Sequence, residues 1–357
     1  MAVGRSLLPM FREEESQAHR GCATCPNQCR PACPVAEVEQ RQTFSPHRLM
    51  GQASLLVRER VLAPSVGAAP WACTGCGRCT EACPHGIDVP TWLLLARNRV
   101  FAAGQAPSAV PRLTAAFGVA GTPQGVDHGP SLRAATGMRP ARSRPHVYVP
   151  GCELLARTPE QVQRFLALSE RLGLGLGLTD ASASCCGAPL AWAGELEAFR
   201  AHARRFAHAL EGASTVVVHD TSCARTLLEL YPRFGVEVAP RVLTVARRLA
   251  EAAFVEPDRE AAFLRCCSSD LDEAPAGFGT PLRTVGCCGA AGLLPETHPE
   301  TAAALAAELG SGYRERARRG EAEHLVVESP RCELHLARHL PDLPVIGLVE
   351  HLASTSS

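Results

Sequence analysis

The sequence predicts an α+β multidomain protein, in which a small helical domain precedes two tandem α/β repeats. The placement of the seventeen cysteines is the first observation behind this prediction. Eight of them lie between Cys22 and Cys83, and the other nine lie between Cys152 and Cys332. The intervening stretch includes a segment rich in Ala, Gly, Pro, Ser and Arg, which is typical of a domain boundary. The predicted domains are residues 1–102 (helical), 103–145 (a linker with one short helix near Leu113–Phe117) and 146–357 (the repeats, divided at about 250/251).

Apolar spacing, the second observation, separates the two parts. In the N-terminal part, Pro46–Leu62 carries Leu and Val at helical spacing, and Pro90 is suited to begin a second helix. In the C-terminal part, short apolar runs predict strands at His146–Val149, Thr215–Val218, Ala262–Leu264 and Leu325–Val327. Longer helical patterns lie between them, at Pro159–Leu172, Gly194–Leu210 and Thr297–Leu309.

An internal repeat supports two halves of about a hundred residues each. The segment Cys185-Cys186-Gly187 matches Cys287-Cys288-Gly289, at an offset of 102 residues. Strands and cysteines on either side of these turns also recur, so that Cys223 matches Cys332 and Cys152 matches Cys267.

Composition excludes several function classes. The formal net charge is zero, which argues against nucleic acid or an anionic membrane as a partner. We expect no transmembrane span, because no stretch of 18 or more apolar residues occurs. Residues 1–20 contain no apolar core of a secretory signal, so we expect a cytoplasmic protein with reduced cysteines. An odd cysteine count also argues against a closed disulfide framework.

The run Cys73-x2-Cys76-x2-Cys79-x3-Cys83-Pro84 has the spacing of bacterial ferredoxins with two [4Fe–4S] clusters. Three closely spaced cysteines on one loop can bind three corners of a cubane, and the fourth is carried to the other cluster. Structural zinc, the alternative, usually takes two separated cysteine pairs.

A second run, Cys22-x2-Cys25-x3-Cys29-x3-Cys33-Pro34, has one residue more between its second and third cysteines. We interpret it as the partner site. The crossover rule then assigns ligands from both runs to each cluster: Cys22, Cys25, Cys29 and Cys83 for cluster 1, and Cys73, Cys76, Cys79 and Cys33 for cluster 2.

The two Cys-Cys-Gly segments predict tight turns that precede helices, because Gly187 and Gly289 allow the turn. A helix N-terminus would favour the thiolate form of these cysteines. With its upstream cysteine, the arrangement resembles the cysteine-rich CCG domain of the heterodisulfide reductase and glycolate oxidase iron–sulfur subunit family. In that family an N-terminal helical domain with two [4Fe–4S] clusters is fused to tandem CCG domains, and the resemblance covers nearly the whole chain.

The chain departs from that pattern in one respect. The family's downstream Cys-x-x-Cys has lost its first cysteine in both halves, where Asp220 and Ser329 stand. The resemblance therefore implies four-cysteine sites instead of five-cysteine ones. The third site would consist of Cys152, Cys185, Cys186 and Cys223, with Asp220 as an added oxygen ligand. The fourth site would consist of Cys267, Cys287, Cys288 and Cys332. Each would hold a further iron–sulfur cluster or a zinc ion, with metal-free buried cysteines as the alternative; Cys266 is an alternative ligand to Cys267.

The function expected is electron transfer. The resemblance implies an iron–sulfur subunit without its own substrate-oxidising site, which receives electrons from a flavoprotein dehydrogenase subunit and passes them to a quinone or another acceptor, with any membrane association through partners. Two alternatives remain: a disulfide reductase acting at the CCG site, and a redox sensor or scaffold with a structural metal.

Overall fold

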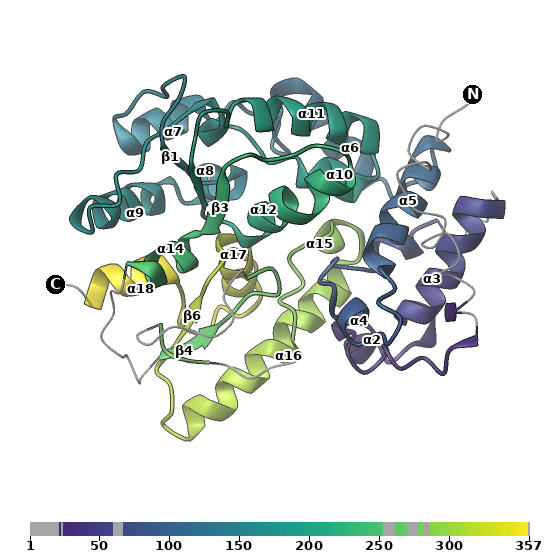
Figure 1. Cartoon of the computed structure of the whole chain (residues 1–357). Helices are drawn as coiled ribbons and strands as arrows, with labels where there is room; N and C mark the ends of the chain where they lie inside the picture. Colours follow the sequence, from purple (N-terminus) through teal and green to yellow (C-terminus); the bar gives the residue numbers. More distant parts are fainter. Residues whose placement is uncertain are drawn as a thin grey trace. The chain divides into compact units, whose positions relative to one another are not determined.

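The computed structural model describes residues 21–22, 24–59, 67–252, 261–269, 278–281 and 286–355. Figure 1 shows the course of the chain. Two compact units are formed, each from several chain segments. The first unit comprises residues 1–115, 189–199 and 285–308, and the second comprises 116–188, 200–284 and 309–357.

Helices dominate the first unit, as the sequence predicts. Their bounds are Pro34–Glu39 (α2), Pro46–Ser54 (α3), Arg78–Glu81 (α4), Val89–Ala102 (α5), Ala188–Ala193 (α10, largely in this unit) and Leu294–Thr297 (α15). Ser45 caps α3 by accepting a hydrogen bond from the Arg48 N–H, and Asp88 caps α5 in the same way from the Thr91 N–H. The helix predicted from Pro46 is confirmed and continues as a π-helical turn, Leu55–Glu59 (η3), while its last predicted residues, 60–62, lie outside the described residues.

The first unit is closed by chain that is remote in sequence. Val35 of α2 packs against Leu294, Ala302 and Leu305. Residues 299–308 belong to the first turns of α16 (Pro299–Arg318). The N-terminal helices therefore depend on residues about 260 to 270 positions later for part of their core.

The segment predicted as a linker contains two helices, Ala109–Ala120 (α6) and Gly129–Thr136 (α7). The short helix predicted near Leu113–Phe117 lies inside α6. Val110, Phe117 and Leu132 are buried, which gives these helices an apolar face despite their small residues. The Gly and Pro residues that suggested a linker lie mostly at helix ends, where they are compatible with helices.

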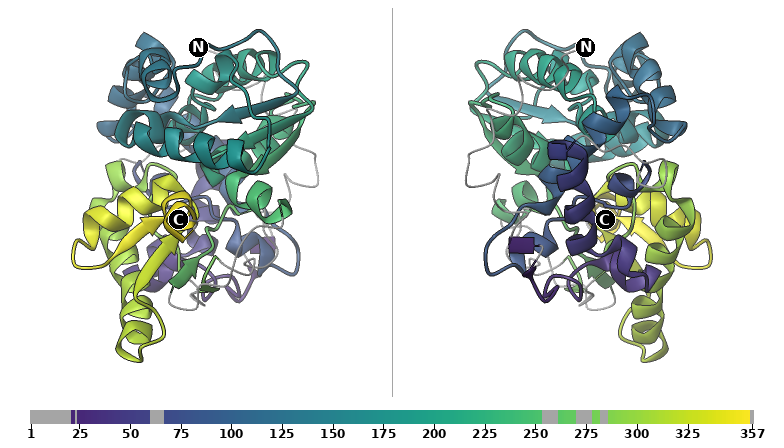
Figure 2. Two further views of the ribbon diagram at one scale, coloured as in Figure 1. Left: turned by 90° about the vertical axis from the view of Figure 1, so that its left-hand side faces the viewer. Right: turned by 90° about the vertical axis from the view of Figure 1, so that its right-hand side faces the viewer.

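Two parallel sheets form the centre of the second unit. One has the order β1-β2-β3, and the other has the order β5-β4-β6-β7. The strands are His146–Val149 (β1), Thr215–Val218 (β2), Arg241–Thr244 (β3), Ala261–Leu264 (β4), Thr280–Pro281 (β5), His324–Val327 (β6) and Val345–Gly347 (β7). Figure 2 lets the sheets be followed by colour, teal to green for the first and green to yellow for the second. The four predicted strands are confirmed, and β3, β5 and β7 were not predicted because their short apolar runs give no clear period.

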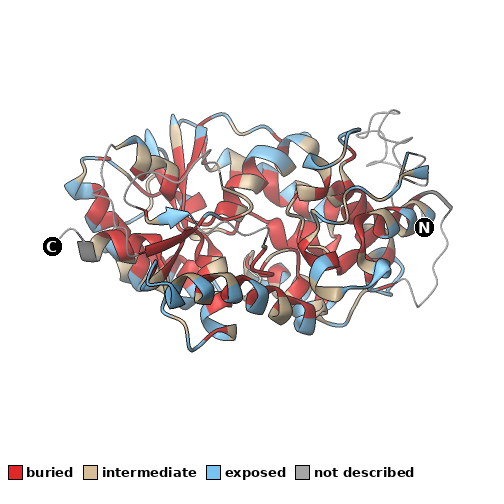
Figure 3. Ribbon diagram, turned by 90° about the horizontal axis from the view of Figure 1, so that it is seen from below, coloured by how far each residue is buried: buried red, intermediate tan, exposed pale blue. Residues whose placement is uncertain are grey.

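Helices surround these strands. They are Cys152–Arg157 (α8), Pro159–Arg171 (α9), Leu196–His208 (α11), Thr221–Arg225 (α12), Tyr231–Arg233 (α13), Val245–Glu251 (α14), Pro330–His339 (α17) and Leu348–Thr355 (α18). The strands are mostly buried, as parallel strands covered on both faces usually are (Figure 3). In the part of the chain that the structure describes, no helix is both long and apolar enough to cross a membrane.

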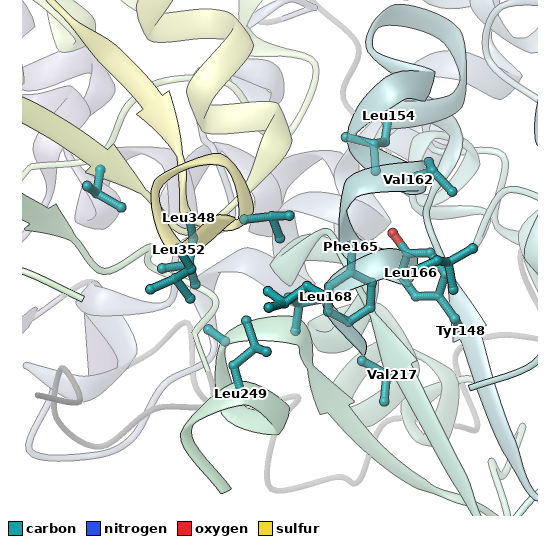
Figure 4. Close-up of a cluster of buried hydrophobic side chains, with 14 of the residues drawn as sticks. Tyr148, Leu154, Val162, Phe165, Leu166, Leu168, Val217, Leu249, Leu348 and Leu352 are labelled. Carbon is teal, nitrogen blue, oxygen red and sulfur yellow. The ribbon is translucent and has the colours of Figure 1, made fainter. Parts of the chain in front are cut away.

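One apolar core joins the two repeats inside the second unit (Figure 4). Tyr148 and Phe165 come from the first repeat, and their ring centroids lie 4.8 Å apart. Phe263, Val326 and Leu352 come from the second repeat and belong to the same cluster of buried side chains. The repeats therefore share a core instead of forming separate domains.

Strand register sets where the loops leave the sheets. Val149 at the end of β1 pairs with Val218 at the end of β2. Leu264 at the end of β4 pairs with Val327 at the end of β6. Because all four strands are parallel within their sheets, the loops that follow them emerge at the carboxyl edges, where α/β proteins usually bind ligands.

Gly194 fixes a close approach within the first unit. It has a φ of +90°, and an added Cβ would lie 2.6 Å from the backbone carbon of Arg97. The Asn98 side-chain amide donates a hydrogen bond to the Gly194 carbonyl, with 2.8 Å between nitrogen and oxygen. Only glycine fits such a position without displacing backbone atoms.

Substitution at this contact tests the packing of the first unit. Gly104 is the matched control, because it also has a positive φ (+70°) but no heavy atom within 4 Å of an added Cβ. We expect Gly104→Ala to lower the free energy of unfolding by about 1–2 kcal/mol through backbone strain. Gly194→Ala should lower it by about 1–3 kcal/mol more through overpacking. Chemical denaturation followed by circular dichroism measures both, and equal losses would contradict the close approach.

Candidate functional site

Four cysteines, here called the first thiol group, line one cavity of the first unit. They are Cys22, Cys25, Cys29 and Cys83. His47 and His85 also line this cavity. Asn27 adopts a left-handed conformation (φ +65°) between Cys25 and Cys29, and its carbonyl accepts a hydrogen bond from the Arg30 N–H. A turn at Asn27 thus accommodates the additional residue of this run, since Asn tolerates positive φ.

A second cavity of the same unit is lined by the second thiol group: Cys33, Cys73, Cys76 and Cys79. Its other walls are largely apolar and include Leu49, Val89 and Leu93. Cys33 is the N-cap of α2, and the backbone N–H groups of Ala36 and Val35 lower the pKa of its thiol against the larger, opposite effect of burial. The Gly75 N–H points to the Cys73 sulfur, with 3.3 Å between nitrogen and Sγ.

Each thiol group combines the two cysteine runs. Cys33, from the first run, lies with the second group, and Cys83, from the second run, lies with the first. A proline follows each of these two cysteines. Pro34 begins α2, and Pro84 lines the first cavity. The structure therefore brings together the same two sets that the crossover rule predicts. Cys79 lines both cavities.

The thiols are in surroundings that disfavour bare thiolates. Burial, and then the neighbouring Cys29, Cys83 and Cys25, raise the pKa of Cys22 to about 11. Burial likewise raises the pKa of Cys33 to about 12 and that of Cys79 still further. Four ionised sulfurs around one small cavity would need positive charge at its centre. An all-sulfur donor set with apolar walls and amide N–H groups fits an iron–sulfur cluster.

The third thiol group, Cys152, Cys185, Cys186 and Cys223, lies wholly in the second unit. Cys152 begins α8 just after β1, and Cys223 lies in α12 just after β2. The Cys185-Cys186 pair stands on the turn before α10, where Gly187 has a φ of +85° and donates its N–H toward the Cys185 sulfur. All four cysteines are buried.

Hydrogen bonds link these four sulfurs in sequence. Cys185 bonds with Cys152 and Cys186, and this raises the pKa of its thiol. Cys186 receives hydrogen bonds from Cys185 and Cys223, and they hold its pKa well below the usual value. Tyr231 donates a hydrogen bond from its hydroxyl to the Cys186 carbonyl at 2.8 Å, and this bond holds the turn in place.

Asp220, predicted as an added oxygen ligand, has protein partners on both carboxylate oxygens. Oδ1 accepts the Ser222 N–H at 2.8 Å as the N-cap of α12, and Oδ2 lies 3.6 Å from Nε of Arg331. Arg331 also lies 3.5 Å from Glu153, and these two carboxylates hold the guanidinium pKa above its usual value although burial opposes them. Sequence reasoning missed Arg331. Its place beside Cys332 was the available signal.

The cysteines of the predicted fourth set belong to different units. Cys287 and Cys288 belong to the first unit, where Gly289 has a φ of +90°. Cys287 contacts Thr74, with 3.6 Å between its Sγ and Oγ1 of Thr74. In the second unit, Cys266 is buried, whereas Cys267 and Cys332 are half-buried.

The loop that follows β4 is held by a buried carboxylate in the second unit. Glu328 accepts the backbone N–H of Cys266 at 2.9 Å and the hydroxyl of Ser269 at 2.7 Å.

Within the described residues, no group of three or more His, Cys, Asp or Glu side chains is arranged to hold a single metal ion. No two of the seventeen cysteines, all of which are described, form a disulfide.

Arg97 and Trp71 were also missed. Arg97 is buried and donates to the Cys73 carbonyl, and Trp71 lies against it, with the ring centroid 5.8 Å from the guanidinium carbon. A charged residue inside the apolar run of α5 was the signal for Arg97, because buried charge is rarely retained without a role.

Comparison with known proteins agrees with this arrangement. Residues 18–87 match the family described as the 4Fe-4S dicluster domain. Residues 146–228 and 276–337 match the family described as the cysteine-rich domain, CCG. The first match spans the first and second thiol groups, and the second match spans the third group and both Cys-Cys-Gly turns.

The chain is also similar to one of the subunits of the fumarate reductase (CoM/CoB) of Methanothermobacter marburgensis, with 26% identity over 368 aligned residues. The alignment covers 95% of this chain and 73% of that protein. Iron–sulfur binding is thus supported by sequence relationship as well as by the arrangement of the thiols. The chain carries a 4Fe-4S dicluster domain joined to cysteine-rich CCG domains, the architecture of the family that its cysteine pattern resembles.

Proposed function

We propose that this chain is the iron–sulfur electron-transfer subunit of a reductase complex and binds two [4Fe–4S] clusters in its first and second thiol groups. The crossed arrangement carries the proposal: each cavity gathers the four cysteines of one set, each set draws on both runs, and Cys79 of the second set also lines the first cavity. That arrangement suits a pair of neighbouring cubanes and has no evident purpose for separate zinc ions.

The bound clusters supply one-electron chemistry, and the chain supplies ligation and surroundings. Cys33 and Cys73 ligate as thiolates, and the Gly75 N–H directed at the Cys73 sulfur stabilises negative charge there. Leu49 and Leu93 contribute apolar side chains to the walls of the second cavity. These are the features by which a protein sets a cluster's reduction potential.

A contact in the first unit supports a route for electrons between the second thiol group and a Cys-Cys-Gly turn. Thr74 stands between Cys73 and Cys76 in the sequence, and its hydroxyl contacts the Cys287 sulfur. Gly292 fits against the same loop, because an added Cβ there would lie too close to the Cys73 carbonyl oxygen for any other residue to be accommodated. Electrons would pass between the second thiol group and the Cys-Cys-Gly turn at Cys287.

The third thiol group is proposed as a further iron–sulfur site, with Cys152, Cys185, Cys186 and Cys223 as ligands. Its continuous hydrogen bonding between sulfurs, at the carboxyl ends of β1 and β2, supports that proposal. Asp220 would then act as N-cap and as the counter-ion of Arg331. The fourth set, Cys267, Cys287, Cys288 and Cys332, stays a prediction from the repeat.

Partners are inferred from relationship. The similar protein is named as one subunit of a reductase, which supports further subunits for this chain also. We propose a flavoprotein subunit as the electron donor, a quinone or another carrier as the acceptor, and a cytoplasmic location that keeps the cysteines reduced.

Double variants test the crossed ligand sets. Cys25→Ala with Cys83→Ala removes two ligands of one proposed cluster, so about 4 of about 8 N-terminal irons should remain. Cys25→Ala with Cys33→Ala damages both clusters, so almost no N-terminal iron should remain. The measurement is iron and sulfide analysis with electron paramagnetic resonance on anaerobically purified full chain.

Uncrossed ligation would reverse these two results. Gln28→Ala is the matched control, because Gln28 lines the first cavity without a thiol and should keep both signals. If the unsubstituted chain and both double variants contained zinc and no iron, the electron-transfer proposal would be wrong.

A single variant tests the third group. The parent chain should contain about 12 irons if this group also holds a cluster, and Cys186→Ala should lower that to about 8 with the N-terminal signals unchanged. Ser184→Ala, two residues away in the same loop, should keep about 12. Zinc that disappears with Cys186→Ala would instead indicate a structural metal at this group.

A further inference from the structure

Arg97 is a buried cation at the base of the second thiol group. It is 2% exposed, and its guanidinium donates three hydrogen bonds to carbonyl oxygens. The acceptors are Pro70 at 2.9 Å, Cys73 at 2.8 Å and Trp192 at 3.2 Å. Arg97 therefore contacts the backbone of a proposed ligand directly.

The charge of Arg97 has no carboxylate beside it. In the part of the chain that the structure describes, its hydrogen bonds go to carbonyls alone. Burial lowers the guanidinium pKa to about 10, so the group still carries its charge at neutral pH. Buried charges are normally paired, because an unpaired one costs several kcal/mol. Among the neighbouring groups, the Cys73 sulfur is the one that favours the charged guanidinium.

We propose that Arg97 is a positioning residue that raises the reduction potential of the cluster held by Cys33, Cys73, Cys76 and Cys79. The inference rests on the proposed function, because it requires that cluster. Reduction adds one negative charge to the cluster, and a fixed cation nearby stabilises the reduced state more than the oxidised state. The effect is strongest in surroundings of low polarity, and the walls of this cavity are largely apolar.

The surroundings hold the cation in place. Trp71 is fully buried and donates its indole N–H to the Trp192 carbonyl at 3.0 Å, the same oxygen that Arg97 binds. Gly194 lies against the Arg97 backbone, as described above. Arg97 thus cannot swing toward solvent without breaking these contacts, so its charge acts on one cluster at a fixed place.

Redox titration of the full chain, monitored by electron paramagnetic resonance, tests the proposal. Arg97→Met should make the second cluster about tenfold harder to reduce, a shift of about −59 mV for one electron, and should leave the first cluster unchanged. Arg97→Lys keeps the charge. It should change the equilibrium constant for reduction of the second cluster by less than about twofold, even if the chain loses stability. Arg112→Met removes an exposed arginine of α6 and should move neither potential, because water screens it.

Several outcomes would overturn the inference. If Arg97→Met keeps both clusters with unchanged potentials, or if Arg97→Lys shifts the potential as far as Arg97→Met, the charge of Arg97 does not set the potential. Should Arg97→Met fail to retain the cluster, Arg97→Gln, which is neutral but keeps amide donors, gives the same comparison with Arg97→Lys. If the Cys76→Ala variant contains as much iron as the unsubstituted chain, the proposed function itself is wrong.

Discussion

The organisation of this protein depends on holding many sulfur atoms close together in buried places. A buried thiol resists ionisation, and an ionised one repels its neighbours, so four in one cavity require positive charge among them. The first and second thiol groups line cavities suited to a cluster that would supply this charge, and in the second group the Gly75 N–H also points to a sulfur. The third group meets it differently, with linked sulfurs and with the charge of Arg331 nearby. One physical problem is therefore solved twice within a single chain.

Parallel pairing gives the C-terminal repeats their chemistry. Strands β1 and β2 end in register, and the residues that follow them include Cys152 and Cys223. The same relation holds for β4 and β6, which are followed by Cys267 and Cys332. A repeated strand–turn–helix unit thus places cysteines at equivalent edges, and the two copies differ at the position held by Asp220 in one and Ser329 in the other.

Much of this could be predicted from local sequence. Cysteine spacing encodes which residues share a loop, so it predicted the sets that the structure brings together in the N-terminal cavities. Strong apolar runs predicted β1 and β2. What escaped depends on long-range packing: only the middle of α6 was predicted, and its full length and all of α7 depend on buried residues such as Phe117 and Leu132. Arg97 and Arg331 escaped for the same reason, because their partners are remote in sequence.

The first unit is assembled from three separated stretches of chain, the last of which ends at residue 308. During synthesis, the eight N-terminal cysteines must therefore leave the ribosome long before Leu294, whose cluster packs against the partly buried Cys33, has been made. The nascent chain passes through a period in which its thiols are exposed to oxidants and to the wrong metals. Maturation of this protein is consequently a matter of timing, because the first unit is complete only when residues up to 308 have been made.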